Sequence, residues 1–136
     1  MTKEELIKEI HNHVFIHFGI DFLKKERHNN KIVALDIFQN ITIEVLRPYF
    51  IRLTDLYNFV GNYSNRDRTS VICSKDRIDL KLFQFPEYRE YYKETTRYFK
   101  KLSGATDLHE EIKVRQNRIK REQRKINQLK KDLECI

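Results

Sequence analysis

The positions of the glycines and prolines most constrain what this chain can fold into. The 136 residues contain only three glycines and two prolines. Most of them stand where an apolar repeat with a helical period begins or ends, at Gly19, Pro48, Pro86 and Gly104. Long segments without a turn residue, in a chain of which 35% is charged, are typical of helices. The sequence therefore predicts an all-α protein.

The first predicted helix starts after Thr2, which can form a capping box with Glu5, and ends before Gly19. A longer second helix is predicted up to Pro48. Its apolar residues are Ile32, Val33, Leu35, Ile37, Phe38, Ile41, Val45 and Leu46. Many of these residues are β-branched, as in a strand, but the length of the segment without a turn signal favours a buried helix.

A helix-turn-helix is predicted over residues 54–80. Thr54 or Asp55 can cap a third helix that carries Leu56, Phe59, Val60 and Tyr63. The polar turn SNRD follows, and a fourth helix begins with arginine and hydroxyl residues, which is the arrangement of this motif. On the fourth helix we expect Val71, Ser74, Lys75 and Ile78 to pack, and Arg66, Thr69, Ser70, Cys73 and Arg77 to face away.

Residues 56–78, LYNFVGNYSNRDRTSVICSKDRI, resemble the carboxy-terminal DNA-binding domain of the bacterial replication initiator DnaA. The family's signature is Gly-Gly-Arg-Asp-His-Thr-Thr-Val after a short helix. Arg66, Asp67, Thr69 and Val71 match it in register, and Ser70 replaces the second threonine. With residues 19–46, which are similar to the family's short helix, basic loop and long helix, the resemblance covers roughly residues 2–82. The chain departs from the pattern at Val60, Ser64, Asn65 and Arg68, where the family has glycines and a histidine.

The resemblance implies a helix that enters the major groove of DNA and a basic loop that touches the minor groove and phosphates. Arginine can bond a guanine edge, threonine can contact thymine, and aspartate can accept from cytosine. The candidates for base or groove-edge contacts are Arg66, Asp67, Arg68, Thr69 and Ser70. Asp67 also suits a helix cap. Lys75 and Arg77 are candidates for phosphate contacts, Lys75 the weaker because it lies near the packing side.

For the basic loop, Lys25, Arg27 and Lys31 are the candidates, by proximity to the family's loop arginine. The alternative for these three residues is a solvated loop without a partner.

The composition favours a polyanionic partner, because the formal net charge is +7. No apolar run is long enough to span a membrane, and the amino terminus lacks the apolar core of a signal peptide, so we expect a cytoplasmic, nucleoid-associated protein without a membrane partner. Cys73 and Cys135 have no partner at metal-ligand spacing and fit a reducing compartment. No nucleophile, phosphate-loop or metalloprotease motif occurs, so no enzyme activity, cofactor, metal or small-molecule substrate is expected.

Two further groups of residues could bind a ligand, one a metal ion and the other single-stranded bases. His13 and His17 stand four residues apart, as two metal ligands would, but no third ligand completes a site, so half-buried histidines are expected. The aromatic residues between Phe83 and Phe99 suggest stacking on single-stranded bases. After Pro86, however, Tyr88, Tyr91, Tyr92, Thr95, Phe99 and Leu102 follow helical spacing, which favours a helix facing the core.

The carboxy-terminal segment has the heptad spacing of a coiled coil. Gly104 suits the end of one helix, and Asp107 with Glu110 forms a capping box for the next, so we expect domains at residues 1–103 and 104–136. The predicted seam contains Ile112, Ile119, Ile126 and Leu133 at its first position and Leu108, Leu129 and Ile136 at its second, where Arg115 and Glu122 interrupt it. Isoleucine at the first position favours a parallel homodimer; a helix folded back on the domain, or paired with another protein, is the alternative.

Together these patterns predict a non-enzymatic protein that binds double-stranded DNA and regulates replication or transcription, in a bacterial or mobile-element setting. The alternatives are an interaction adaptor that acts through the tail and, third, a module that binds single-stranded nucleic acid through its tyrosines.

Overall fold

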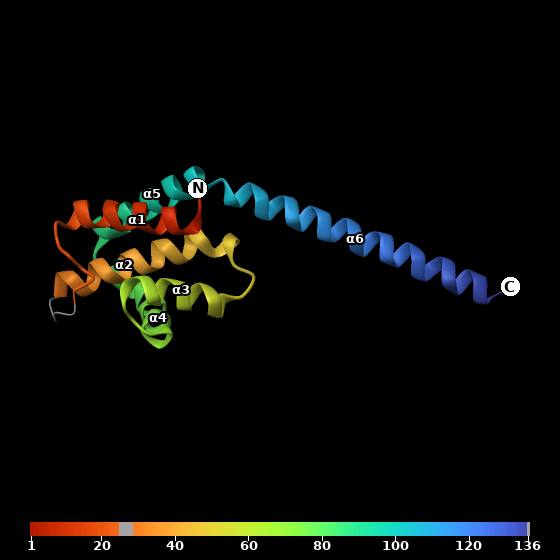
Figure 1. Cartoon of the computed structure of the whole chain (residues 1–136), viewed down its shortest axis with the longest axis horizontal. Helices are drawn as coiled ribbons and strands as arrows, with labels where there is room; N and C mark the ends of the chain where they lie inside the picture. The colour runs from red at the N-terminus through yellow and green to blue at the C-terminus, as the bar shows by residue number, and fades with distance from the viewer. Residues whose placement is uncertain (25–28, 136) are drawn as a thin grey trace. The chain divides into compact units, whose positions relative to one another are not determined.

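A computed structural model describes the backbone of residues 1–24 and 29–135, and the side chains of these residues except residues 29 and 105–111. Within these ranges the chain forms helices and no strand, which confirms the all-α prediction. The elements in order are α1 (Lys3–Phe18), α2 (Asn29–Leu46), the short 3-10 helix η1 (Arg47–Tyr49), α3 (Leu53–Ser64), α4 (Arg68–Gln84), α5 (Pro86–Ser103) and α6 (Ala105–Glu134) (Figure 1). None of these helices is long and apolar enough to cross a membrane.

The chain divides into two units, residues 1–105 and residues 106–136. In the first unit α2 is the central helix, because α1, α3, α4 and α5 all pack on it (Figure 1). The core side chains that are at most 2% exposed come from every one of these helices and include Leu6, Ile10, Val14, Ile37, Phe38, Ile41, Leu56, Val60, Val71 and Phe99. Burying one large apolar side chain stabilises the folded state by roughly 1.5–3 kcal/mol. The core that the five helices share therefore holds them together.

Several predicted helix ends are confirmed. The hydroxyl of Thr2 accepts a hydrogen bond from the Glu5 amide at 3.2 Å, and Gly19 ends α1 in the left-handed conformation with φ 65°. Pro86 is the first residue of α5, where its missing amide hydrogen costs no hydrogen bond, and Gly104 follows the helix with φ 65°. These ends fix the lengths of α1 and α5, both of which pack on α2.

Other predicted ends are wrong by a few residues. The helix expected to begin at Thr54 or Asp55 begins at Leu53, after Arg52 in an extended conformation and without a side-chain cap. The carboxy-terminal helix begins at Ala105, so Asp107 lies inside its first turn rather than at its cap. In both places the residue suited to capping lies within the first turn, and the helix begins before it.

The aromatic residues of α5 pack against α1 and α2. Tyr92 is 8% exposed and its hydroxyl donates to Glu44 of α2 at 2.9 Å, while Tyr91 stacks on His17 of α1 with ring centroids 3.7 Å apart. The predicted core-facing side of this helix is therefore correct at most positions. It is wrong at Leu102, which is 43% exposed near the end of the helix.

His13 and His17 are used in this same contact between α1 and α5. Nδ1 of His13 lies 2.8 Å from the hydroxyl oxygen of Tyr91, and both histidines are exposed rather than half-buried as expected. Burial lowers the pKa of His17, an effect to which the neighbouring His13 adds. Among the described residues no group of three or more histidine, cysteine or acidic side chains is placed to hold a metal ion.

Gly61 permits the tight connection between α3 and α4. It is buried in α3, and its carbonyl oxygen accepts a hydrogen bond from the Arg66 amide at 2.8 Å. A Cβ atom placed on Gly61 would lie 2.7 Å from the carbonyl oxygen of Arg66. This carbonyl oxygen belongs to the backbone, so it cannot rotate away from a new Cβ atom as a flexible side chain could. A residue larger than glycine therefore forces the turn to move.

We predict that Gly61→Ala destabilises the protein by about 1–3 kcal/mol, the usual cost of overpacking a close contact. Helix propensity alone predicts the opposite sign, because alanine in a helix is favoured over glycine by roughly 1 kcal/mol. Thermal unfolding of the full chain distinguishes the two. Asn58→Ala, an exposed change in the same helix, is the control and should leave the melting temperature nearly unchanged. A higher melting temperature for Gly61→Ala would refute the close approach.

Candidate nucleic-acid interface

The connection between α3 and α4 consists of three residues, Asn65, Arg66 and Asp67. Asn65 ends α3 in the left-handed region with φ 55°, which asparagine tolerates better than most residues other than glycine. The turn thus has its left-handed residue without a glycine at this position. In Figure 1 α4 is seen close to end-on while α3 runs across the view, so the two helices cross. A sharp polar turn followed by a crossing helix leaves the amino end of α4 open to solvent.

Asp67 caps α4. Its Oδ1 accepts a hydrogen bond from the Ser70 amide at 2.7 Å, and this bond, together with one from the Ser70 side chain, lowers the pKa of the Asp67 carboxyl. The carboxylate therefore stays charged at neutral pH and is occupied by the helix end. The structural duty expected for Asp67 as a cap is confirmed, and it competes with any contact to a cytosine amino group.

Arg68, Thr69 and Ser70 form the first turn of α4, and all three are exposed. The side chains of Arg68 and Thr69 have no hydrogen bond or ion pair within the part of the chain that the structure describes. Beside them lies an open, mostly polar hollow of about 540 Å³, lined by Gly61, Asn62, Asn65, Arg66, Asp67 and Ser70. We call Arg68, Thr69 and Ser70 together the α4 entry face.

Arg66 is placed differently from its neighbours. Its Nη1 donates to the carbonyl oxygens of Ser64 at 3.2 Å and Asn65 at 3.1 Å, so the guanidinium closes over the end of α3. These carbonyls are among the groups that a helix leaves without partners at its carboxy end. Arg66 thus stabilises the turn, and the guanidinium would have to leave these carbonyls to reach a base.

Lys75 and Arg77, the candidates for phosphate contacts, are both engaged by the protein. Lys75 is exposed rather than packed, and its ammonium donates to the hydroxyl of Tyr57 in α3 at 3.0 Å. Nη2 of Arg77 forms an ion pair with Oδ1 of Asp36 at 3.0 Å, although half of the Arg77 side chain remains exposed. The expectation that Lys75 shares the packing side is therefore wrong. The buried side of α4 consists of Val71, Ser74, Ile78 and Leu82.

The candidates of the basic loop divide into two groups. Lys25 and Arg27 lie outside the described residues. Lys31 does not stand in a loop as expected: it lies in the first turns of α2 and is 4% exposed. The helix begins three residues before Ile32, the first residue of the predicted apolar repeat, and this earlier start carries Lys31 into the packed region.

Buried polar side chains of α2 position the turn and α4, and the sequence patterns did not reveal them. Gln39 donates to the hydroxyl of Ser64 at 3.1 Å, and Asn40 donates to the carbonyl and hydroxyl oxygens of Ser74 at 3.3 and 3.2 Å. Asp36, with a side chain 2% exposed, pairs with both Arg77 and Lys81. The signal in the sequence is the spacing of Asp36, Gln39 and Asn40, which puts three polar residues on one face within the apolar part of the helix.

The predicted seam of the carboxy-terminal helix is open to solvent throughout its described part. Ile112 is 51% exposed, Ile119 68%, Ile126 45%, Leu129 67% and Leu133 72%. The side chains of Arg115 and Glu122, which interrupt the seam, are exposed as well. An apolar stripe of this kind within a single chain is a surface to which another molecule can bind.

Comparison of the chain with known protein families, with curated proteins and with solved structures found no match.

Asp36→Asn should test how firmly α4 is held. We predict a loss of about 2–4 kcal/mol in unfolding free energy, because two cations lose a buried partner; the loss is moderated since Arg77 is half exposed and can be hydrated. Asp76→Asn, at an exposed position of α4, makes the same charge change and is the matched control. Chemical denaturation measures both variants. Equal, small losses for the two would show that the ion pairs of Asp36 do not anchor α4.

Proposed function

We propose that this protein binds double-stranded DNA through the α4 entry face, with the amino end of α4 placed against the major groove. One observation carries the proposal. The first turn of α4 presents an arginine, a threonine and a serine to solvent directly after a three-residue turn, while the opposite side of the same helix is anchored in the core. These side-chain types can bond base edges and phosphates. The net charge of +7 adds attraction to a polyanion.

The contacts within the protein assign different duties to the candidate residues. Arg68 and Thr69 are the proposed base-reading residues, because their side chains are exposed and have no partner among the described residues. Ser70 shares its hydroxyl with Asp67 and suits a phosphate or groove-edge contact. Lys75 and the exposed half of Arg77 suit phosphates, which accept a cation over a wider range of positions than a base edge does.

The likeness of residues 56–78 to the DNA-binding domain of DnaA supports the same assignment and makes a role in the regulation of replication or transcription the proposed context. In this proposal the protein is not an enzyme and acts on the chromosome or another DNA by binding alone. Use of the α5 tyrosines for single-stranded bases is less well supported, since Tyr91 and Tyr92 are bonded to His13 and Glu44.

Pairing through α6 is the second part of the proposal. Its apolar seam is exposed along the described helix, and two chains that pair through it present two DNA-binding domains on one molecule. Linking two modules raises the effective concentration of the second after the first has bound. The alternative function is that of an adaptor, in which the same apolar seam of α6 binds a different protein.

To test the interface, duplexes that the full-length protein prefers are first selected from a random library, and binding is then measured by fluorescence anisotropy with random duplex for comparison. We predict that Arg68→Ala weakens binding to the selected duplex by about 1–3 kcal/mol and reduces the preference over random duplex. Thr69→Ala should also weaken binding and reduce the preference, but to a smaller extent, because it removes one hydroxyl and one methyl group rather than a charged guanidinium group.

The matched control is Arg97→Ala, which removes the same charge from an exposed position on α5. It should weaken both duplexes only slightly and equally, through the change in net charge. If Arg68→Ala and Arg97→Ala have the same effect on both duplexes, base reading by the α4 entry face is excluded. A protein that binds single strands better than duplex would contradict the proposed function itself.

A further inference from the structure

We propose that α6 pairs with α6 of a second copy of this chain in the antiparallel direction, in the register that sets Ile119 of one chain opposite Glu122 of the other. The inference deepens the pairing proposed above and does not depend on DNA binding. It rests on three features of α6: an uninterrupted helix, an exposed apolar seam, and two charges of opposite sign within that seam.

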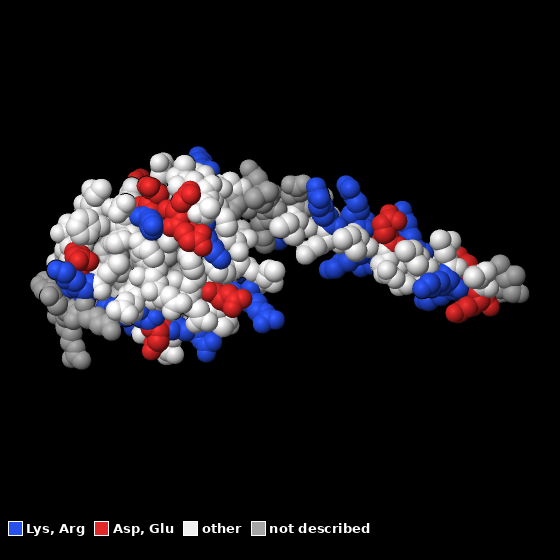
Figure 2. Space-filling model, in the orientation of Figure 1, with Lys and Arg blue, Asp and Glu red and all other residues white. Residues whose placement is uncertain are grey.

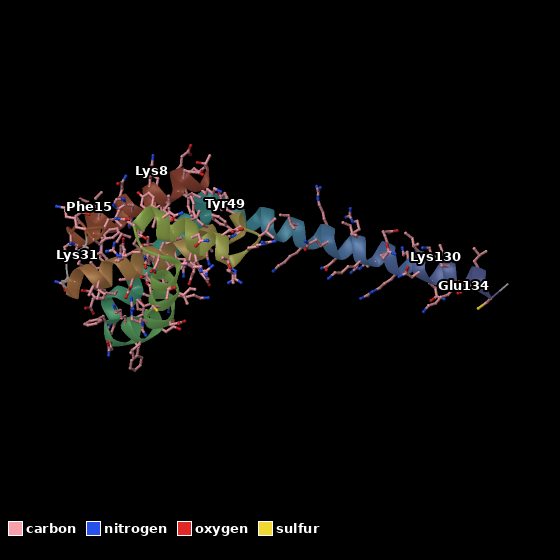
Figure 3. The ribbon with its side chains drawn as sticks, turned by 60° about the horizontal axis from the view of Figure 1, so that its bottom comes forward. Lys8, Phe15, Lys31, Tyr49, Lys130 and Glu134 are labelled. Atoms are coloured by element: carbon pink, nitrogen blue, oxygen red, sulfur yellow. The ribbon has the colours of Figure 1, made fainter. Side chains whose placement is uncertain are left out.

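The first feature is the continuous helix. α6 runs from Ala105 to Glu134 without a break, a length of about 45 Å at 1.5 Å per residue. Its side chains, Lys130 and Glu134 among them, project outward from the helix (Figure 3). Every described residue from Ile112 to Cys135 is exposed. The described seam residues are therefore accessible to a second helix along this length.

The charges in the seam distinguish the two directions of pairing. Arg115 and Glu122 occupy the same heptad position seven residues apart, and both are exposed. In a parallel pair in register, each residue meets its own copy, so arginine faces arginine and glutamate faces glutamate across the seam. Like charges brought together out of water oppose association. The parallel direction expected from isoleucine at the first heptad position holds where leucine fills the second, and here Arg115 and Glu122 stand in place of leucine.

The antiparallel direction removes both conflicts. In the proposed register Ile112 lies opposite Leu129, Arg115 opposite Ile126, and Ile119 opposite Glu122 of the second copy. Arg115 then lies one layer from Glu122 of the other chain, and the symmetry of the pair makes this contact twice. The stems of arginine and glutamate cover the facing isoleucines while the charged groups reach each other at the edge of the seam. The chain thus supplies the complement to its own seam.

This register also extends the apolar contact to the ends of the helix. Leu133 lies opposite residue 108, which is a leucine in the sequence. Among the described residues Glu122 forms an ion pair with Lys125 at 3.9 Å, and both side chains are well exposed, at 64% and 74%. Such an exposed pair is weak, so Glu122 can turn to the second chain at little cost.

Basic residues of α6 lie beside the seam and, in larger number, away from it. Lysine and arginine side chains follow the described part of α6 (Figure 2). Arg118 and Lys125 of the second copy flank the seam in this register and repel each other, an effect that salt screens. Five basic residues lie away from the seam and remain available to a polyanion: Lys113, Lys120, Arg121, Arg124 and Lys131. Salt screens these repulsions and the Arg115–Glu122 attractions alike, whereas binding to DNA should weaken as salt is added.

Antiparallel pairing puts the two starts of α6 at opposite ends of the paired helices. The two domains of residues 1–105 are then separated by about the length of α6, roughly 45 Å, which exceeds the one-turn spacing of about 34 Å between adjacent half-sites. A dimer of this kind is suited to two well-separated sites, or to sites on two duplexes.

The native Cys135 tests the direction. Cys135 and Cys73 are both exposed, so Cys73→Ser leaves a single site for a nitroxide label near the carboxy end. In the proposed register residue 135 lies opposite residue 106, and pulsed electron resonance should give a distance between labels of about 45 Å. A parallel pair would put the labels roughly 10–20 Å apart, and this result overturns the proposal.

A control site near the middle of the helix reports pairing itself. Arg121→Cys, in a chain that also carries Cys73→Ser and Cys135→Ser, puts labels opposite residue 120, so the distance is short in either direction. A short distance here together with the long one at Cys135 supports the proposal. No distance at either site means that α6 does not pair with itself, which overturns both the orientation and the dimer while leaving the DNA measurements unaffected.

A change of seam charge gives an independent readout. Arg115→Glu should weaken dimerisation about tenfold in sedimentation experiments, because two cross-chain attractions become repulsions, and adding Glu122→Arg should restore it. In a parallel pair Arg115→Glu only exchanges one like-charge contact for another. An unchanged dimerisation constant for Arg115→Glu would therefore overturn the antiparallel register.

Discussion

The buried polar face of α2 is the constraint on which the arrangement of α3 and α4 depends. An apolar core alone would let two helices slide or rotate at small cost, since apolar contacts have little directionality. Asp36, Gln39 and Asn40 remove this freedom, because each must keep a partner once it is withdrawn from water. Their partners lie at the end of α3 and along α4. A rotation of α4 would therefore leave buried polar groups unsatisfied, and the first turn of α4 is held in one orientation toward solvent.

The same geometry explains why one side of α4 is available to a ligand and the other is not. Val71, Ser74 and Ile78 face the core, while the ion pairs of Asp36 hold the later turns of the helix. The amino end is the part of α4 that we propose for binding, because Arg68 and Thr69 are exposed there next to the cap made by Asp67. Arg66 and Asp67, which match the DnaA signature, act in this chain on the turn itself. These two residues thus stabilise the turn, and the neighbouring Arg68 and Thr69 are the proposed base-reading residues.

The features that the sequence predicted correctly are those decided by near neighbours. Thr2, Gly19, Pro86 and Gly104 mark helix ends because a cap or a left-handed residue acts within about four positions. The fold class follows from the helical periods between them. The anchoring of α4 could not be read in this way, because the partners of Asn40 and Asp36 stand 34 and 45 residues further along the chain. The same reason explains the errors at Lys31 and Lys75, whose placement follows from how α2 and α4 pack rather than from their neighbours. The pairing proposed for α6 is only partly predictable from near neighbours. Its heptad repeat is local, but the direction of pairing depends on contacts with a second chain.

Amide hydrogen exchange of the full-length protein, with and without a selected duplex, probes whether α4 contacts DNA at its amino end. If the amino end of α4 lies against DNA, exchange should slow at residues 65–73 when duplex is added, because these amides lose access to water. Residues 86–103 of α5, on which the account places no contact, should exchange at the same rate in both conditions. Slowing confined to α5, or no change at residues 65–73 at a duplex concentration that saturates binding, would contradict the claim that this protein reads DNA with the first turn of α4.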